Sequence, residues 1–230
     1  MHDTQFPRDS VKLGLWDAFC TYHTIANVAV PLFAQANGTV VTSAHGHDHR
    51  VLLRRSHAME ALVIREVSNV LTPTSDSDGL LYMMLWLDGR IVLPLYIGKA
   101  GRYGRGAGNV SANLLAIARN FGKFARWGSN YAYHIGDLSA AVCPDHAPLR
   151  ITPKYRRWAE RLFVEAPSEH PRLRRPVHFW CTAWSPTSRS IWTDFGSTSL
   201  AFEEYLLIGV ASLLFPDTLL NTEGVNRSGS

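Results

Sequence analysis

The chain has 230 residues, of which 46% are hydrophobic and 18% are charged, and its formal net charge is +4. This length and composition suit one globular core with an attached N-terminal piece, and they exclude collagen-like, mucin-like and low-complexity chains. No apolar run is long enough to cross a bilayer and no secretory signal pattern is recognised, so we expect no membrane partner. The three cysteines are widely spaced, which predicts neither a disulfide framework nor a zinc knuckle and favours a cytoplasmic location.

The first third of the chain is expected to be helical. Apolar residues recur at helical spacing over residues 12–31 and 52–71, and a loop containing glycine and histidine separates these two segments. The alternating histidines of this loop lack the paired spacing of zinc ligands, so a surface loop is favoured over a metal site. These histidines are His45, His47 and His49. The turn-rich segment 72–79 predicts an exposed connection, which separates an N-terminal helical region, residues 1–78, from the rest.

A β-hairpin is predicted directly after this connection. Residues 80–87 and 91–98 form two short apolar runs, and the Asp88-Gly89 dipeptide between them is typical of a tight hairpin turn. Pro94 has no backbone N–H, so we expect the second strand to be exposed or bulged at that point.

Further strands and helices are expected to alternate after the hairpin. A glycine-rich loop leads into a helix that Ser111 can cap, and this loop lacks the lysine–serine ending that a nucleotide-binding P-loop requires. Later strands are predicted at residues 131–136 and 177–184, and later helices at 155–163 and 200–215. This order of elements predicts an α+β fold in which a small sheet with antiparallel strands is flanked by helices.

Two tyrosine segments and a downstream glutamate form an ordered set in the second part of the chain. Leu80-Leu81-Tyr82 begins the first hairpin strand, and Tyr96-Ile97-Gly98 ends the second. Glu204 lies near the start of the last predicted helix, which is followed by Pro216 and Asn221. This set resembles the GIY-YIG nuclease superfamily, and its restriction endonucleases most closely. Two leucines replace the glycine and isoleucine of GIY, and Pro216 lies further from Glu204 than the usual spacing.

The resemblance covers residues 79–221 and implies a GIY-YIG-like catalytic core with a basic insertion at about 143–175. Residues 222–230 are expected to form a flexible tail. The implied function is a metal-dependent DNA endonuclease that hydrolyses phosphodiester bonds, and a restriction endonuclease is one form that this function can take.

The resemblance also assigns roles to individual residues. Tyr82 would take the proton from the attacking water and Tyr96 would position it, while Glu204 would hold a single Mg²⁺ or Mn²⁺ ion through its carboxylate. The neighbouring Glu203 projects roughly 100° away on a helix, so only one of the two glutamates can point into the site. Asn221 matches the terminal asparagine of the family. It is expected to fix the local backbone, to bridge to a metal-bound water or to sit in a helix-exit turn.

The proton-accepting tyrosine needs a cation nearby. An ordinary tyrosine has a pKa of about 10, so a positive charge must lower it before the side chain can act as a base near neutral pH. Lys99 directly follows the YIG segment and is one source of this charge, while phosphate contact or solvent exposure suits its loop position equally well. His134 is a secondary candidate for a hydrogen bond near the scissile phosphate, although a histidine within a strand more often has a structural role.

An arginine is also expected, because the transition state of phosphodiester hydrolysis carries additional negative charge that a guanidinium binds well. The family position on the helix after YIG holds Asn113, so the role passes to arginines nearby. Arg126 and Arg105 are favoured over Arg102 and Arg119 as the catalytic arginine.

A basic cluster interleaved with Tyr155, Trp158 and His170 spans residues 150–175. Such a cluster suits the phosphate backbone of DNA, whereas any one of its arginines alone fits a solvated helix face equally well. The residues predicted to contact DNA are Arg102, Arg156, Arg157, Arg161, Arg174 and Arg175.

Two other functions stay open from the sequence. One is a nucleic-acid-binding or interaction module that keeps the fold without catalysis, which the asparagine at position 113 favours. The other is a structural protein in which Trp180, Trp184 and Trp192 form an interface, although aromatic residues more often belong to a core. The sequence leaves the oligomeric state undetermined.

Overall fold

The structure is a computed structural model that describes residues 6–45, 47, 49–102 and 134–225. Several sequence predictions fall outside these residues. They concern the helix expected after Ser111, the tail from residue 226 onward, and the residues Arg105, Asn113, Arg119 and Arg126.

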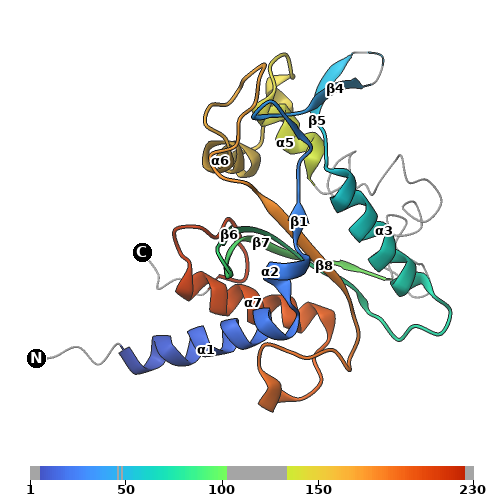
Figure 1. The fold of residues 1–230 in the computed structure, drawn as a ribbon, viewed down its shortest axis with the longest axis vertical. Helices are drawn as coiled ribbons and strands as arrows, with labels where there is room; N and C mark the ends of the chain where they lie inside the picture. The colour runs from blue at the N-terminus through green and yellow to red at the C-terminus, as the bar shows by residue number, and fades with distance from the viewer. Residues whose placement is uncertain (1–5, 46, 48, 103–133, 226–230) are drawn as a thin grey trace, which may run out of the picture.

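An antiparallel sheet of four strands lies at the centre of the described residues (Figure 1). Its strands are, in order across the sheet, β1 (Val30–Pro31), β8 (His178–Trp184), β6 (Gly79–Asp88) and β7 (Ile91–Gly101). Each neighbouring pair is antiparallel, so the predicted α+β class with an antiparallel sheet is confirmed. The predicted hairpin is confirmed as well, because β6 and β7 pair along their whole length around the predicted turn.

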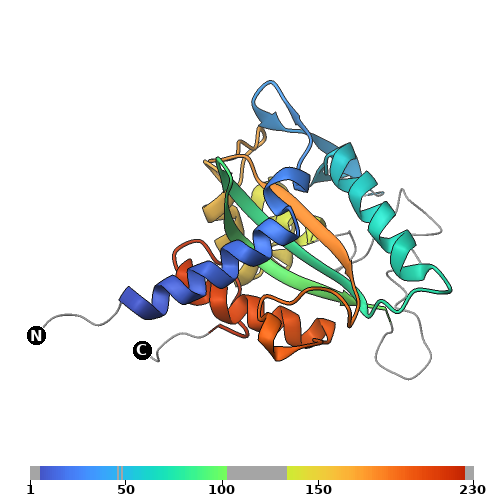
Figure 2. The same ribbon diagram turned by 60° about the horizontal axis from the view of Figure 1, so that its bottom comes forward.

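Helices cover both faces of this sheet (Figure 2). On one face, α1 (Phe6–Tyr22) and α7 (Leu200–Leu214) contact each other. The other face is covered by α3 (His57–Leu71), α5 (Ile135–Val142) and α6 (Pro153–Leu162). Shorter elements are α2 (Ile25–Val28) and the 3₁₀ turns η2 (Pro148–Arg150) and η3 (Thr193–Phe195). No helix within the described residues is long and apolar enough to cross a membrane.

Local chemistry sets the start of three of these helices. The Ser56 hydroxyl accepts the Met59 backbone N–H at 3.0 Å, which caps α3. Ser199 caps α7 in the same way. Pro153 opens α6, where its missing N–H costs no helical hydrogen bond. The helices predicted at 155–163 and 200–215 are therefore present with small shifts in their bounds.

The N-terminal region contains the expected helices but is not helical throughout. The helix expected over residues 12–31 ends at Tyr22, and Thr24 takes a left-handed backbone conformation with a φ of 49° before α2. Two short hairpins follow where no strands were predicted. They are formed by β2 (Gln35–Ala36) with β3 (Thr39–Val40), and by β4 (Thr42–His45) with β5 (Arg50–Leu53).

The strand predicted at residues 131–136 is wrong in its described part. His134 takes a left-handed conformation with a φ of 58°, and α5 begins at the next residue. Aromatic and β-branched residues suggested a strand, but Ile135, Leu138 and Val142 are all buried at helical spacing. Burial of this helical face has overridden the local strand preference.

The central strand β6 is apolar at almost every position because helices cover both of its faces. Successive side chains alternate between the faces. Leu81 and Met83 pack in the core beneath α1 and α7, while Tyr82 and Met84 pack in the core beneath α3, α5 and α6. The unbroken apolar run in the sequence therefore reflects a strand that is buried on both sides.

A β-bulge beside Pro94 changes the direction of the side chains along β7. The pairing with β6 passes from Pro94 to Tyr96, which leaves Leu95 as an extra residue. The bulge expected at this proline is confirmed. Because the extra residue reverses the alternation, Tyr96 joins Tyr82 on the face of the sheet that α6 covers, while Ile97 faces α7.

Candidate active site

The hairpin brings the two motif tyrosines together. The ring centroids of Tyr82 on β6 and Tyr96 on β7 are 6.5 Å apart, and their planes are tilted by 32°. Phe179 of β8 stacks on the other side of Tyr82, with 6.0 Å between the ring centroids. Tyr82 is buried and only 5% exposed, whereas Tyr96 is partly exposed. Tyr96 is therefore the member of the pair that a ligand can reach first.

The glycine of the YIG segment makes room for Tyr82. Gly98 is paired with Tyr82 across the hairpin. A Cβ atom at position 98 would lie 2.7 Å from the Cε2, Cζ and Oη atoms of the Tyr82 ring, closer than side chains pack in proteins. The tyrosine of the first segment and the glycine of the second thus form one packing unit.

The structure separates the roles of the two neighbouring glutamates. Glu203 is fully buried, and its carboxylate accepts the Ile191 backbone N–H at 2.9 Å and the Thr198 hydroxyl at 3.0 Å. Burial raises the pKa of Glu203, and these hydrogen bonds oppose the rise. Glu204 instead forms an ion pair with Lys99 of β7, and its side chain is 16% exposed. Glu203 holds the loop before α7, and Glu204 is the glutamate directed at the YIG strand.

Glu204 and the tyrosine pair lie on opposite sides of β7. Lys99 has the same orientation as Ile97, toward α7, while Tyr96 faces α6. β7 is the last strand in the order of the sheet. The negative charge of Glu204 still raises the pKa of both Tyr82 and Tyr96. Lys99 was a candidate cation for the tyrosines, and its ion pair is with Glu204 instead.

Both tyrosines are protonated at neutral pH. Burial, followed by the charges of Tyr96 and Glu204, raises the pKa of Tyr82 well above 10. Burial and the charge of Glu204 raise the pKa of Tyr96 to about 12. In this state each phenol can donate a hydrogen bond, and it must lose its own proton before it can accept one.

Asn221 fixes the backbone of the YIG segment. Its side-chain Oδ1 accepts the Ile97 N–H and its Nδ2 donates to the Ile97 carbonyl, both at 2.9 Å. The preceding Leu220 N–H donates to the Leu95 carbonyl at 2.7 Å. The segment after α7 therefore pairs with the free edge of β7. These hydrogen bonds join Asn221 to the backbone of the YIG strand, and the other roles considered for it stay predictions.

The carboxylate of Glu204 is the kind of ligand that a divalent cation prefers. Mg²⁺ binds hard oxygen ligands, and it often uses one or two protein carboxylates together with water and substrate phosphate. The Lys99 ammonium would have to leave the carboxylate for such an ion to bind. Among the residues that the structure describes, no group of three or more His, Cys, Asp and Glu side chains could hold a metal.

Most of the arginines predicted to contact DNA also donate hydrogen bonds within the protein. Arg157 donates to the Leu220 carbonyl at 3.1 Å, and Arg161 to the Asp217 carbonyl. Others donate to backbone carbonyls as well, namely Arg102 to Ser75 and Thr72, Arg174 to Glu160 and Val164, and Arg175 to Leu87. Arg156 is exposed on α6. These contacts use only some of the five donors of each guanidinium, so a phosphate contact remains compatible with them.

A group of residues around Tyr96 was not recognised as a unit in the sequence. The Tyr96 ring contacts the rings of His134 and Trp158, and His134 in turn contacts the ring of Tyr155. The Lys154 ammonium lies 4.8 Å from the centroid of the Tyr96 ring. His134 and Tyr155 share a hydrogen bond through Nδ1 and the phenol oxygen. Burial and the charge of Lys154 lower the pKa of His134 to about 3, so its imidazole is neutral. A lysine and two aromatic residues within five positions of α6 were the available signal.

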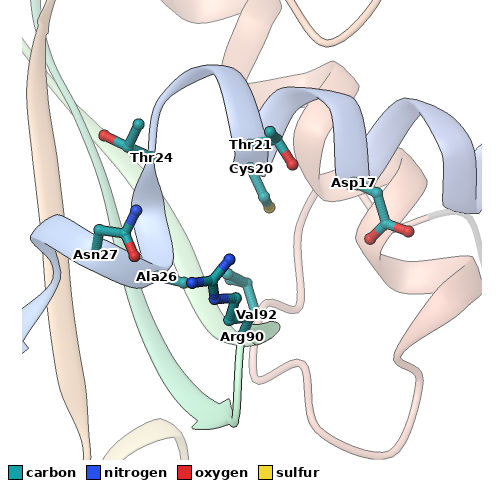
Figure 3. Close-up of a pocket in the computed structure, with 8 residues that line it drawn as sticks. All are labelled: Asp17, Cys20, Thr21, Thr24, Ala26, Asn27, Arg90 and Val92. Atoms are coloured by element: carbon teal, nitrogen blue, oxygen red, sulfur yellow. The ribbon is translucent and has the colours of Figure 1, made fainter.

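The remaining sequence candidates lie outside this group. Trp180 and Trp184 are buried in the core, whereas Trp192 is 47% exposed. A pocket of about 150 Å³ lies between α1, α2 and the start of β7, where the Cys20 thiol and the Arg90 guanidinium line it (Figure 3). None of the motif residues lines this pocket. Burial raises the pKa of Cys20, so the thiol stays protonated and unreactive.

The fold and the site define an α+β protein in which an antiparallel hairpin carries a tyrosine pair next to an ion-paired glutamate. No protein-family model, curated protein or solved structure matches the chain. A function for this chain therefore has to be argued from its own residues.

Proposed function

We propose that the chain is a metal-dependent DNA endonuclease that hydrolyses phosphodiester bonds beside Tyr96, in the cytoplasm. The observation that carries the proposal is the packing of Tyr82 over Gly98 next to Tyr96. This packing links both tyrosine segments of the GIY-YIG resemblance, and Asn221 holds the same strand. Residues that the resemblance names separately thus meet in a small part of the molecule.

The proposed reaction uses the charges around the tyrosine pair. Tyr96 is partly exposed and donates a hydrogen bond to a phosphate oxygen or to the attacking water. Tyr82 must lose its own proton before it can act as a base. Neutralising the charge of Glu204 favours this loss, because that charge, after burial and the charge of Tyr96, raises the pKa of Tyr82. A divalent ion held by Glu204 would supply this neutralisation and Lewis-acid polarisation of the phosphate.

Cleavage of supercoiled plasmid tests the proposal. Wild-type protein is expected to produce nicked or linear DNA with Mg²⁺ or Mn²⁺ and to leave the plasmid intact with EDTA. Glu204→Gln is expected to abolish cleavage and to retain DNA binding. Glu160→Gln, which changes an exposed carboxylate on α6, is the matched control and should cleave at the wild-type rate. Cleavage by Glu204→Gln at the wild-type rate would rule out the metal role.

A nucleic-acid-binding module without catalysis is the second candidate. The observation in its favour is the ion pair between Lys99 and Glu204, which already neutralises the proposed metal ligand. In that case the protein binds DNA equally well with and without EDTA, and plasmid stays intact under all metal conditions. Lys99→Met separates the two candidates, because freeing the carboxylate should strengthen Mn²⁺ binding only if Glu204 is a metal ligand.

A further inference from the structure

Lys154 lies in a cage of aromatic rings next to the candidate active site. Its ammonium is 4.8 Å from the ring centroid of Tyr96, 5.2 Å from that of Trp158 and 5.4 Å from that of Tyr155. Trp158 is fully buried and Tyr155 is nearly so. Because three ring faces surround the ammonium, the otherwise flexible lysine side chain is held at a fixed place beside Tyr96.

The ammonium has no carboxylate within ion-pair distance among the described residues. Burial lowers the pKa of Lys154, and the more distant charges of Glu223 and Asp137 oppose this effect. Aromatic faces attract a cation but do not accept its N–H groups as a carboxylate does. Lys154 therefore holds hydrogen-bond donors that an anionic ligand can use.

A second cation lies on the same side of α6. Arg157 follows Lys154 by three positions, a spacing that places both on one helix face. The positive charge of Arg157 further lowers the pKa of Lys154, as expected for two like charges held close together. An anion between them would relieve this repulsion. Arg157 is exposed and is oriented by its hydrogen bond to the Leu220 carbonyl, next to the asparagine that fixes the YIG strand.

We propose that Lys154 binds a phosphate group of DNA beside Tyr96, with Arg157 as a second contact, so that α6 forms the cationic wall of the candidate active site. This inference rests on the proposed nuclease function, for which it names the group that binds the substrate backbone. Lys154 is a binding residue that places the phosphate next to the Tyr96 hydroxyl. The aromatic cage fixes its position before DNA arrives.

Salt-dependent DNA binding tests this inference without any cleavage. Fluorescence anisotropy with a labelled DNA duplex in EDTA gives the Kd at several KCl concentrations for wild type, Lys154→Met and Lys154→Arg. Lys154→Met is expected to weaken binding about tenfold, the effect of one charge-assisted hydrogen bond, and to reduce the slope of log K against log salt by about 0.9. Lys154→Arg should keep the wild-type slope. Arg90→Met removes an exposed cation at the far end of the hairpin and should also leave the slope unchanged.

Lysine side-chain NMR tests the cage itself. The chain has only four lysines, so the ε-methylene signals of labelled protein can be assigned by the loss of one signal in Lys154→Arg. The Lys154 signal is expected upfield of the others because of ring currents, and it should move when the duplex is added. A signal at the ordinary lysine position, or one that DNA leaves unmoved, overturns the inference.

The outcomes separate this inference from the proposed function. If Lys154→Met binds DNA with the wild-type affinity and salt slope, Lys154 is not a phosphate contact, whether or not the protein cleaves DNA. If the slope depends on Lys154 but plasmid stays intact with metal, the contact stands and the nuclease proposal fails. Absence of DNA binding by the wild-type protein overturns the inference.

Discussion

At Gly98, the ring of Tyr82 lies where a larger residue would place its Cβ. The position requires glycine because of this close approach. An unusual backbone angle is not the reason, since Gly98 has no positive φ. The identity of one residue therefore decides where the Tyr82 ring lies relative to Tyr96. This gives the glycine of the YIG segment a physical role that holds independently of catalysis.

Gly98→Ala is expected to destabilise the protein by about 1–3 kcal/mol, the usual cost of forcing extra atoms into a packed core. The new methyl group must displace the Tyr82 ring from beneath β7. Gly209→Ala on α7 is the matched control, because nothing lies within 4 Å of its added Cβ and alanine favours a helix by about 0.5–1 kcal/mol. Urea unfolding of both variants measures the difference. Equal stabilities would contradict the close packing of Gly98 against Tyr82.

The lowered pKa of His134 predicts that the protein loses stability in acid. Its pKa falls to about 3 in the folded state, because of burial first and the charge of Lys154 second. The unfolded chain has a histidine pKa of about 6.5, so between pH 6.5 and 3 the unfolded state binds the additional proton. The contribution of His134 to stability is therefore fully present above pH 6.5 and is lost as the pH falls toward 3.

Comparison of wild type with His134→Gln isolates this effect from those of other histidines. As the pH falls from about 6.5 toward 3, the free energy of unfolding should decrease more steeply for the wild type than for the variant. His134 contributes up to about 1.4 kcal/mol per pH unit to this difference. The variant should be less stable at pH 7 and approach the wild type near pH 4. Denaturant unfolding at a series of pH values gives both curves, and parallel curves would show that His134 is not buried as a neutral group.

At the scale of elements, the edge of β7 is closed by the chain segment that follows α7. Leu220 and Asn221 satisfy the backbone of Leu95 and Ile97, so the strand that carries Tyr96 has partners on both sides. An unpaired edge strand would be free to bend or to bind another strand. The edge pairing keeps the bulge and the Tyr96 side chain in one orientation.

Asn221→Ala is expected to cost about 2–4 kcal/mol, because it leaves a buried N–H and a buried carbonyl of Ile97 without their partner. The change should also speed hydrogen exchange of the Ile97 amide. Thr222→Ala, at the exposed next position, serves as the control and should change stability by less than about 0.5 kcal/mol. Unchanged exchange at Ile97 in Asn221→Ala would exclude the edge-pairing role.

The sequence predicted those elements that are specified by neighbouring residues. The β6–β7 hairpin follows from two apolar runs around Asp88-Gly89, and the bulge follows from Pro94. β1 could not be predicted, because its two residues become a strand only by pairing with Phe179 and His178 of β8. Such a long-range partner leaves no local signal.

The candidate site also contains some residues that the sequence indicated and others that only the folded chain brings together. Tyr82, Tyr96, Glu204 and Asn221 were found because their order along the chain resembles a known pattern, and their catalytic roles stay predictions. The cage around Tyr96 was missed because it joins β7 to α6, and only the folded chain brings Lys154 to the Tyr96 ring. The ion pair of Lys99 with Glu204 was missed for the same reason.

At the scale of the whole molecule, the first third of the chain is built into both cores. Trp16 of α1 is buried beneath the sheet, and its indole N–H donates to the Val92 carbonyl at 3.1 Å. Glu66 of α3 accepts the Ala183 N–H of β8 at 3.1 Å. Residues 1–78 were predicted as a separate helical region, and these contacts show how closely they are joined to the sheet.

A fragment that begins at residue 72 is therefore expected not to fold cooperatively on its own. Without α1 the core around Leu81 and Met83 loses one of the two helices that cover it, and without α3 the core around Tyr82 loses one of its three helices. Losing part of both cores removes more burial than a domain of ordinary marginal stability can lose. Circular dichroism during thermal unfolding and NMR signal dispersion of the fragment test this against the full chain. A sharp transition near that of the full chain would instead mean that the chain divides into two domains at residue 78, in which case the tyrosine hairpin is stable without the helices that cover it.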